Sequence, residues 1–355
     1  MLETIRATAG DYLREADEIG RAQDRHAIHY QRLGSSSLQS IWSAEQAVQL
    51  DTVRSEKDNL RVAWWRLLET GHIDELGDMC LGLMWWWLIN GHLTDGSAWT
   101  TEALDAGLVL DAMTEAKLRL AAGTMLYPRG RLDEAAVQLD VATNLARTAG
   151  DEALLAWALT IQANLEAYRG RPEAAVAMAN ELDQLAGPAS PLRMFSAIAR
   201  AHVAIGCGDF DAAKRVLSGV TAQARELETP WAIAVSLGTN GRVTAVLGDT
   251  VRAESMLIES LQIFVRLEDR WGLMHTLTHL ADAAALRGDG ARAAMLYGVG
   301  DQLVEQTGVS IFPAWQLRSD ECQARAIEAL GWDTFRDRRF EGRQLSREEL
   351  VAELS

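Results

Sequence analysis

A glycine-centred turn recurs along the 355-residue chain at intervals of 38 to 40 residues. The turn glycines are Gly130, Gly170, Gly208, Gly248 and Gly288. The fifth residue after each of them is alanine, at Ala135, Ala175, Ala213, Ala253 and Ala293. The seventh residue before each is small, at Gly123, Ala163, Ala201, Gly241 and Ala281. Self-similarity at a fixed period predicts an array of stacked structural units.

Each unit is predicted to be a hairpin of two antiparallel α-helices. The turn glycine can adopt the left-handed conformation that ends a first helix, and the Asp that follows it in three repeats can cap a second. The small residues on both sides of the turn allow the two backbones to approach where the helices cross. Between turns, apolar residues follow helical spacing. One such stripe consists of Leu273, Leu277, Leu280 and Ala284. Two helices of about 15 residues, or about 22 Å each, fit one repeat.

Composition also favours helices over strands. The chain has six prolines and 6% aromatic residues, and it is rich in residues that lose little side-chain freedom in a helix. No segment alternates apolar and polar residues in the manner of a half-buried strand. The expected fold class is therefore all-α.

The repeat resembles the tetratricopeptide repeat over roughly residues 114–306. In that family a small residue in the first helix, a Gly-Asp-like turn and an alanine in the second helix occupy these relative positions. The resemblance implies a right-handed α-solenoid of helical hairpins. The units here are longer than the usual 34 residues, so we expect the extra length in the helices or in the links between hairpins.

Upstream, residues 58–113 are predicted to form further, diverged hairpins with turns at Gly71 and Gly91. This region holds six of the twelve tryptophans. They are Trp64, Trp65, Trp85, Trp86, Trp87 and Trp99. They could form an aromatic ligand pocket, but packing is favoured, because three consecutive tryptophans point in three directions around a helix.

Nearly the whole chain resembles a more specific class of protein. The strings that carry the resemblance are Met1–Arg6, His26–Tyr30, Glu56–Arg61, Gly91-His-Leu, Arg270-Trp-Gly-Leu and Gly342–Leu350. They are similar to the region after the nucleotide-binding core in large bacterial STAND ATPase transcriptional regulators of the LuxR and maltose-activator type. In that family the repeat array senses an inducer or a partner. The sequence contains no GxxxxGK[ST] phosphate loop, so the resemblance implies a truncated or free-standing sensor region.

The resemblances together suggest four segments. Residues 1–57 would be an N-terminal helical segment similar to the end of a winged-helix or linker region, and residues 58–113 the Trp-rich hairpins. Residues 114–306 would be the repeat array, and residues 307–355 the C-terminal capping helices.

Charge and cysteine content limit the partners. A formal net charge of −16 disfavours direct binding of nucleic acid, which depends on Lys and Arg that neutralise phosphates. Three widely spaced cysteines without a CxxC pair give no indication of disulfides or zinc. The longest apolar run, residues 81–89, is far shorter than the roughly 20 residues needed to span a bilayer. We therefore expect a cytoplasmic protein without membrane contact.

Motifs for catalysis or metal binding are weak. His275 and His279 have a metal-ligand spacing of four residues, but no third ligand is identifiable. His26 and His29 are paired in a similar way and are equally unsupported. No nucleophile-elbow motif occurs. We therefore predict no catalytic residue, no metal and no cofactor.

A polar column six residues before each turn glycine is the main candidate site. Its members are Thr124, Asn164, His202, Arg242 and Asp282. In tetratricopeptide arrays the matching position lines the concave groove, and stacking would place these residues in a ladder. Trp157, Phe195 and His275, thirteen residues before their glycines, would add apolar walls. The alternative is that all of these are ordinary half-exposed helix residues.

The predicted function is a non-catalytic sensor or scaffold module of a transcriptional regulatory system. Its concave face would bind a protein, a peptide or a small-molecule inducer. The alternatives are an enzyme with its site in the Trp-rich region, or a self-assembling structural array. Self-association into a homo-oligomer is left open by the sequence.

Overall fold

The computed structural model describes residues 8–9, 11–13, 15–40, 43–187, 190–310, 313–346 and 349–350, and these form an all-helical chain. The N-terminal helices are α2 (Ile19–Ser40), α3 (Gln46–Ser55), α4 (Lys57–Glu69), α5 (Ile73–Asn90) and α6 (Leu93–Asp105). The repeat helices are α7 (Ala112–Leu126), α8 (Leu132–Ala149), α9 (Glu152–Tyr168), α10 (Pro172–Leu185), α11 (Leu192–Gly206), α12 (Phe210–Glu226), α13 (Pro230–Val246), α14 (Thr250–Leu267), α15 (Arg270–Arg287) and α16 (Gly290–Thr307). A short 3-10 helix, η1 (Tyr127–Arg129), follows α7, and α17 (Pro313–Leu330) and α18 (Trp332–Gln344) close the array. The string Met1–Arg6 and part of Gly342–Leu350 lie outside the described residues.

The predicted hairpins are confirmed as five helix pairs, from α7 with α8 to α15 with α16. All five turn glycines have φ between 70° and 96°, the left-handed region that glycine adopts without steric cost. The Asp after the glycine caps the following helix in three repeats. Asp209, Asp249 and Asp289 accept hydrogen bonds from the backbone N–H groups of Ala212, Arg252 and Arg292, respectively.

The two small-residue columns lie where the paired helices cross, as predicted. A Cβ added at Gly241 would lie 2.8 Å from Leu257 Cγ and 3.2 Å from Ala253 O. Gly123 faces Leu139 in the same way, with 2.6 Å between an added Cβ and Leu139 Cγ. Only a small side chain permits this approach, so the columns fix the contact inside each hairpin.

The extra length of the repeats lies in the helices. Helices α13 and α14 have 17 and 18 residues, and α15 begins three residues after α14 ends.

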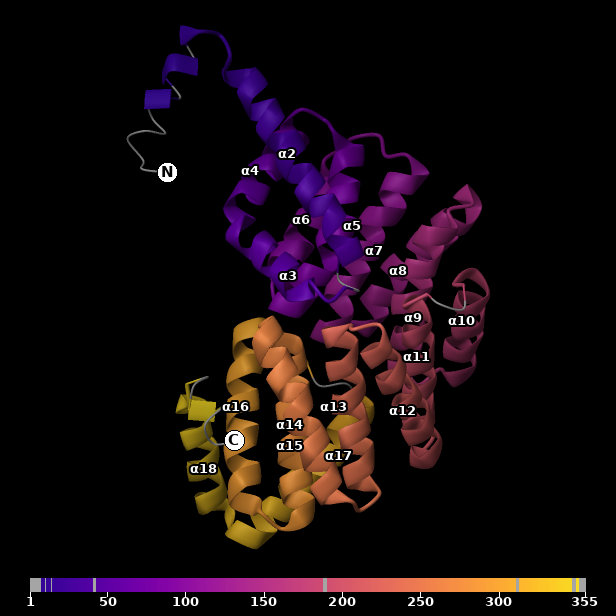
Figure 1. The fold of residues 1–355 in the computed structure, drawn as a ribbon, viewed down its shortest axis with the longest axis vertical. Helices are drawn as coiled ribbons and strands as arrows, with labels where there is room; N and C mark the ends of the chain where they lie inside the picture. Colours follow the sequence, from indigo (N-terminus) through magenta and orange to yellow (C-terminus); the bar gives the residue numbers. More distant parts are fainter. Residues whose placement is uncertain are drawn as a thin grey trace.

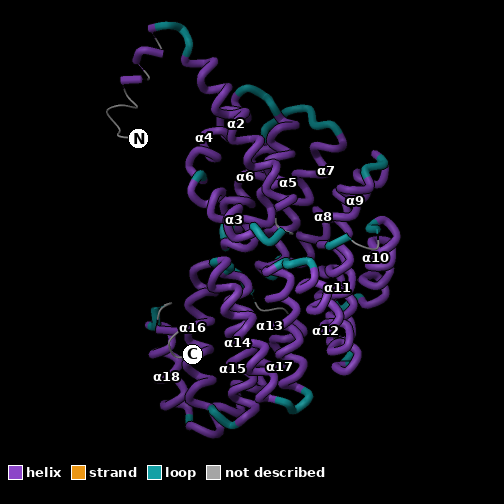
Figure 2. The backbone as a smooth tube through the Cα atoms, in the orientation of Figure 1, coloured by secondary structure: helices purple, strands orange, loops and turns teal. Residues whose placement is uncertain are grey.

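The solenoid curls until its two ends meet. In Figure 1 the chain runs from α2 at the top, around the side through α8 to α12, and back beneath the N-terminal helices through α13 to α18. Helix α5 contacts α15, and α3 contacts α14. Across this junction Trp231 N donates to Gln46 Oε1 at 3.1 Å, and Ser310 N donates to Pro128 O at 2.8 Å. Figure 2 shows the same path, with loops confined to the ends of the helices.

The Trp-rich region is a packed core, as the sequence analysis favoured. Trp64, Trp85, Trp86 and Trp87 are buried. Trp64 stacks on the half-buried Trp99, with 4.9 Å between the ring centroids. The turns predicted at Gly71 and Gly91 are present, and both glycines have a φ of 73°. The four-segment division of the chain stays a proposal.

The C-terminal helices cover the end of the array. Gly298 on α16 and Gly342 on α18 lie at a close crossing, and an added Cβ on either would lie 1.9 Å from a backbone oxygen of the opposite helix. Within the described part of the chain, no helix is both long and apolar enough to cross a membrane.

Candidate ligand-binding interior

The eight predicted site residues all lie on first helices of the hairpins. Thr124 lies on α7, Trp157 and Asn164 on α9, Phe195 and His202 on α11, Arg242 on α13, and His275 and Asp282 on α15. The structure places these residues in the interior of the solenoid rather than along an open groove. Trp157 is half-buried and the other seven are buried.

The groove is filled because α5 packs against the inner face of the solenoid. The indole of Trp85 on α5 contacts aromatic rings from three successive first helices. Its centroid lies 6.1 Å from that of Trp157, 5.4 Å from Phe195 and 5.2 Å from Trp231. The Trp85 side chain thus fills the space along the inner face of the solenoid, where the repeat pattern predicted an open groove.

The middle of the ladder is a chain of neutral hydrogen bonds. His202 Nδ1 lies 3.2 Å from Asn164 Oδ1, and His202 Nε2 lies 3.3 Å from the Tyr168 hydroxyl. A neutral imidazole that donates from Nδ1 and accepts at Nε2 satisfies both contacts. Burial lowers the pKa of His202 to about 4, which keeps the ring neutral near pH 7. Thr124, at the start of the ladder, donates to its own helix at Leu120 O, 2.8 Å away.

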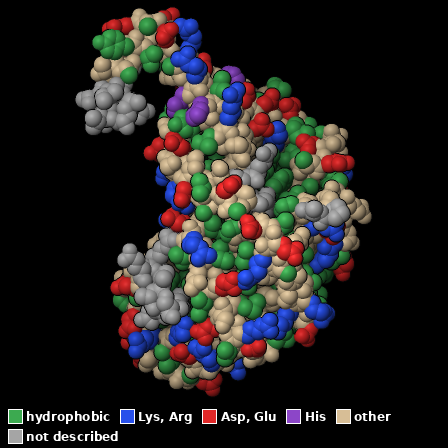
Figure 3. Space-filling model, in the orientation of Figure 1, with side chains coloured by type: hydrophobic (Ala, Val, Ile, Leu, Met, Phe, Trp, Pro, Cys, Tyr) green, Lys and Arg blue, Asp and Glu red, His purple; other side chains and the backbone are tan. Residues whose placement is uncertain are grey.

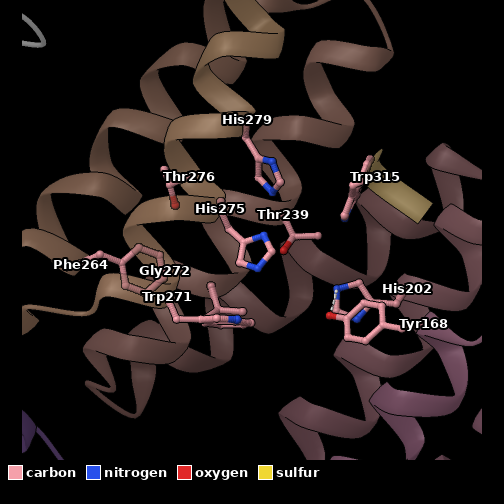
Figure 4. A pocket seen from close by; sticks show the side chains of 12 residues that line it. Tyr168, His202, Thr239, Phe264, Trp271, Gly272, His275, Thr276, His279 and Trp315 are labelled. Atoms are coloured by element: carbon pink, nitrogen blue, oxygen red, sulfur yellow. Dashed lines mark hydrogen bonds between the residues drawn. The ribbon is translucent and has the colours of Figure 1, made fainter. Parts of the chain in front are cut away.

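The two histidines of α15 belong to an aromatic cluster (Figure 4). Trp271 lies edge-on to His275, with 4.9 Å between centroids, and His279 lies 5.7 Å from Trp315 on α17. The cavity among these rings has a volume of about 40 Å³, and a neighbouring one around Trp85 and Trp231 has about 30 Å³. Such volumes accommodate water molecules but no larger ligand.

A buried ion pair and its polar partners join four helices beside this cluster. Arg242 Nη2 lies 2.5 Å from Asp282 Oδ2 and donates to Trp315 O at 3.0 Å. The Arg242 guanidinium also lies 4.1 Å from the centroid of the Trp315 ring, and its Nη1 lies 3.1 Å from His279 Nδ1. Asp282 Oδ1 accepts from the Tyr297 hydroxyl at 2.6 Å and from Ser319 Oγ at 2.8 Å.

Burial dominates the electrostatics of this pair. It lowers the pKa of Arg242 and raises the pKa of Asp282, while the attraction between the two groups opposes both shifts. The pair is held by four further polar contacts, as a buried charge requires. It therefore connects α13, α15, α16 and α17 through one network.

A cavity of about 480 Å³ opens above this ion pair, between α13, α15 and α17. Its residues are Arg242, Ala245, Val246, Asp282, Leu286, Arg318, Glu321, Cys322, Ala324 and Arg325. Ligand sites for small molecules occupy about 300 to 1,000 Å³ and combine apolar walls with a few polar groups. The cavity meets both conditions, and two of the predicted residues, Arg242 and Asp282, form part of it.

Sequence reasoning missed the α17 side of this cavity and the aromatic filling of the axis. Trp231 and Trp271 occupy the same repeat position, seventeen residues before their turn glycines. This recurrence could have indicated that aromatic rings fill the interior. Nothing in the repeat pattern placed Arg318 or Arg325, because α17 lies beyond the last matching turn.

The fold and its interior define a tetratricopeptide-like helical-repeat solenoid. A solved structure described as Rap protein complexed with competence and sporulation factor has this fold. It aligns with a TM-score of 0.56 and 16% sequence identity, over 94% of this chain and 96% of that one. The all-α repeat prediction is therefore confirmed.

Sequence comparison finds longer relatives, while no family model matches the chain. Proteins of Mycobacterium bovis and Mycobacterium tuberculosis, each named "Putative HTH-type transcriptional regulator", are 25% identical over 278 residues. The alignment covers 78% of this chain and 27% of each relative. The chain thus spans about a quarter of the length of these relatives, and it has weak similarity to transcriptional regulators.

Proposed function

We propose that this chain is a non-catalytic sensor module of a transcriptional regulatory system, and that it binds a peptide or small-molecule inducer in the cavity between α13, α15 and α17. The observation that carries the proposal is the cavity of about 480 Å³ with the Arg242–Asp282 pair at its base. The similarity to longer regulators supports a regulatory setting, and the STAND-type resemblance suggests an ATPase partner domain. An intracellular location follows from the same proposal.

The network beneath the cavity offers a physical route for a response. Arg242 hydrogen-bonds to His279 on α15 and to the Trp315 carbonyl on α17, so a ligand that contacts Arg242 would be coupled to both helices through it. Movement of any of these helices changes the packing of His275, Trp271 and the rings that close the axis. Ligand binding would thereby shift the relative positions of the last two hairpins and α17, to the extent that it favours one arrangement over another.

Thermal unfolding with a ligand panel tests this function, because a ligand that binds only the folded state raises its melting temperature. The panel contains peptides, sugars, nucleotides and small carboxylic acids. The variant Ala324→Trp places a large side chain in the cavity from an exposed position on α17. The control is Ala329→Trp, at an exposed position on the same helix that does not line the cavity.

We expect at least one compound to raise the melting temperature of the wild type and of Ala329→Trp but not of Ala324→Trp. If no compound shows this dependence, the cavity is not the ligand site. A compound that is chemically altered by the protein would support the enzyme alternative instead.

A further inference from the structure

We propose that the ligand of this cavity is an amphiphilic monocarboxylate, with its carboxylate between Arg318 and Arg325 and its aliphatic part against Val246 and Leu286. This inference rests on the proposed function and adds the chemical class of the ligand. The shared chemistry could be supplied by the C-terminus of a short apolar peptide or by a free medium-chain carboxylic acid.

The charges around the cavity point to an anion. Arg242 is already neutralised by Asp282 at 2.5 Å. Arg318 and Arg325 lie on α17, two turns apart, and in the described part of the chain neither forms an ion pair. With Glu321 as the remaining carboxylate, the cavity carries a formal charge of +1 in a chain of −16. A single carboxylate balances this charge, whereas a doubly charged phosphate would leave an excess of negative charge.

The position of Arg318 is fixed by an aromatic ring. Its guanidinium carbon lies 4.6 Å from the centroid of Phe210, at the start of α12. A guanidinium that stacks on a ring face keeps its N–H edge free to donate in the plane of the group. The side chain is half-buried, so a hydrogen bond to a carboxylate there is less exposed to competition from water than one at the open surface.

The remaining walls are apolar. Ala245, Val246 and Leu286 come from the C-terminal turns of α13 and α15, and Ala324 comes from α17. The Cys322 side chain is buried, and burial raises the pKa of its thiol to about 12, so it adds another uncharged surface. An aliphatic chain or a pair of branched side chains would cover this surface and release water from it.

Isothermal titration calorimetry with two acids and their neutral amides tests the assignment. The acids are octanoate and N-acetyl-Leu-Leu with a free carboxylate, and the controls are octanamide and N-acetyl-Leu-Leu-amide. The proteins are the wild type, Arg318→Gln, Arg325→Gln and the matched control Arg266→Gln, which changes an exposed arginine on α14 away from the cavity. Circular dichroism verifies that each variant is folded, and Arg325 is exposed, so its replacement leaves the core intact.

We expect at least one acid to bind about tenfold more tightly than its amide, as a charge-assisted hydrogen bond would provide. Arg318→Gln and Arg325→Gln should each remove most of that preference, and Arg266→Gln should retain it. Tighter binding of octanoate would identify a free acid as the source, and tighter binding of the dipeptide acid would identify a peptide C-terminus.

The assignment is overturned if neither acid binds, if acid and amide bind equally, or if Arg266→Gln weakens binding as much as the two cavity variants. These results leave the proposed function intact when another compound of the panel still stabilises the protein in a manner that Ala324→Trp abolishes. The proposed function fails separately, when no compound of any class depends on Ala324.

Discussion

Arg242 is a buried charge, because its side chain is only 2% exposed. The removal of a guanidinium and a carboxylate from water costs several kcal/mol per ion, and their mutual attraction offsets this only with good geometry and further hydrogen bonds. The structure supplies both: Arg242 contacts Trp315 O and His279, and Asp282 accepts from the hydroxyl groups of two residues, Tyr297 and Ser319. The loss of one partner is therefore expected to cost far more than the loss of both.

Single and double replacement of the pair should differ in stability. We expect Arg242→Met or Asp282→Leu alone to lower the free energy of unfolding by about 3 to 5 kcal/mol, because an uncompensated charge stays buried. The double variant should lose much less than the two single losses together. Urea unfolding of the four proteins measures this coupling. Additive losses would show that the two charges do not interact.

Buried groups with shifted pKa values contribute to the pH dependence of stability. The pKa of His202 is lowered to about 4 and that of His275 to about 3, and burial also lowers the pKa of His279. These groups stabilise the fold above the ordinary histidine pKa of 6.5, and the contribution is lost as the pH falls. Burial raises the pKa of Asp269 to about 7, so its contribution is present below about pH 4 and is lost as the pH rises toward 7.

Burial raises the pKa of both Asp269 and Asp282, but three histidines have lowered pKa values, so the unfolded chain binds more protons than the folded chain between pH 4 and 6.5. We therefore expect the melting temperature to fall between pH 7 and pH 5. His275→Phe, which keeps a ring against Trp271, should make this fall shallower, whereas His29→Gln at the exposed surface of α2 should leave it unchanged. An equal fall of the melting temperature in all three proteins would show that His275 does not contribute to the pH dependence.

At the scale of helices, local rules predicted the hairpins well. Glycine turns, Asp caps and small-residue crossings depend on residues close in sequence, and all three were found where the pattern placed them. The inner face was not predictable in the same way, because its shape depends on the sum of small rotations between many hairpins. The repeat pattern therefore placed Asn164 and His202 correctly on their helices but could not reveal that Trp85 would fill the axis beside them.

The contact of α16 with α18 gives a direct test at this scale. In Gly342→Ala the new Cβ would lie 1.9 Å from Met295 O, so the two helices must separate. We expect a loss of about 1 to 3 kcal/mol, or more, from such overpacking. The control is Gly219→Ala on α12, where nothing lies within 4 Å, and it should gain up to about 1 kcal/mol through helix propensity. Equal stability of the two variants in urea would show that α18 is not packed as described.

At the scale of the whole molecule, the chain is acidic, with a formal net charge of −16. Figure 3 shows acidic and basic side chains interspersed over the face that it presents. Together with the net charge of −16, this arrangement gives no basic surface for nucleic acid on that face. The closure of the solenoid through α3, α5, α14 and α15 has a second consequence. It closes the inner face of the solenoid, so under the proposed function the ligand enters the cavity of about 480 Å³ beside α17.

Hydrogen–deuterium exchange with and without a stabilising compound from the panel shows whether a ligand binds between α13, α15 and α17. We expect slower exchange in the backbone around residues 242–246, 282–286 and 318–325, with the segment 64–99 unchanged. Protection confined to the Trp-rich segment 64–99, or no change in the three cavity segments, would contradict this expectation.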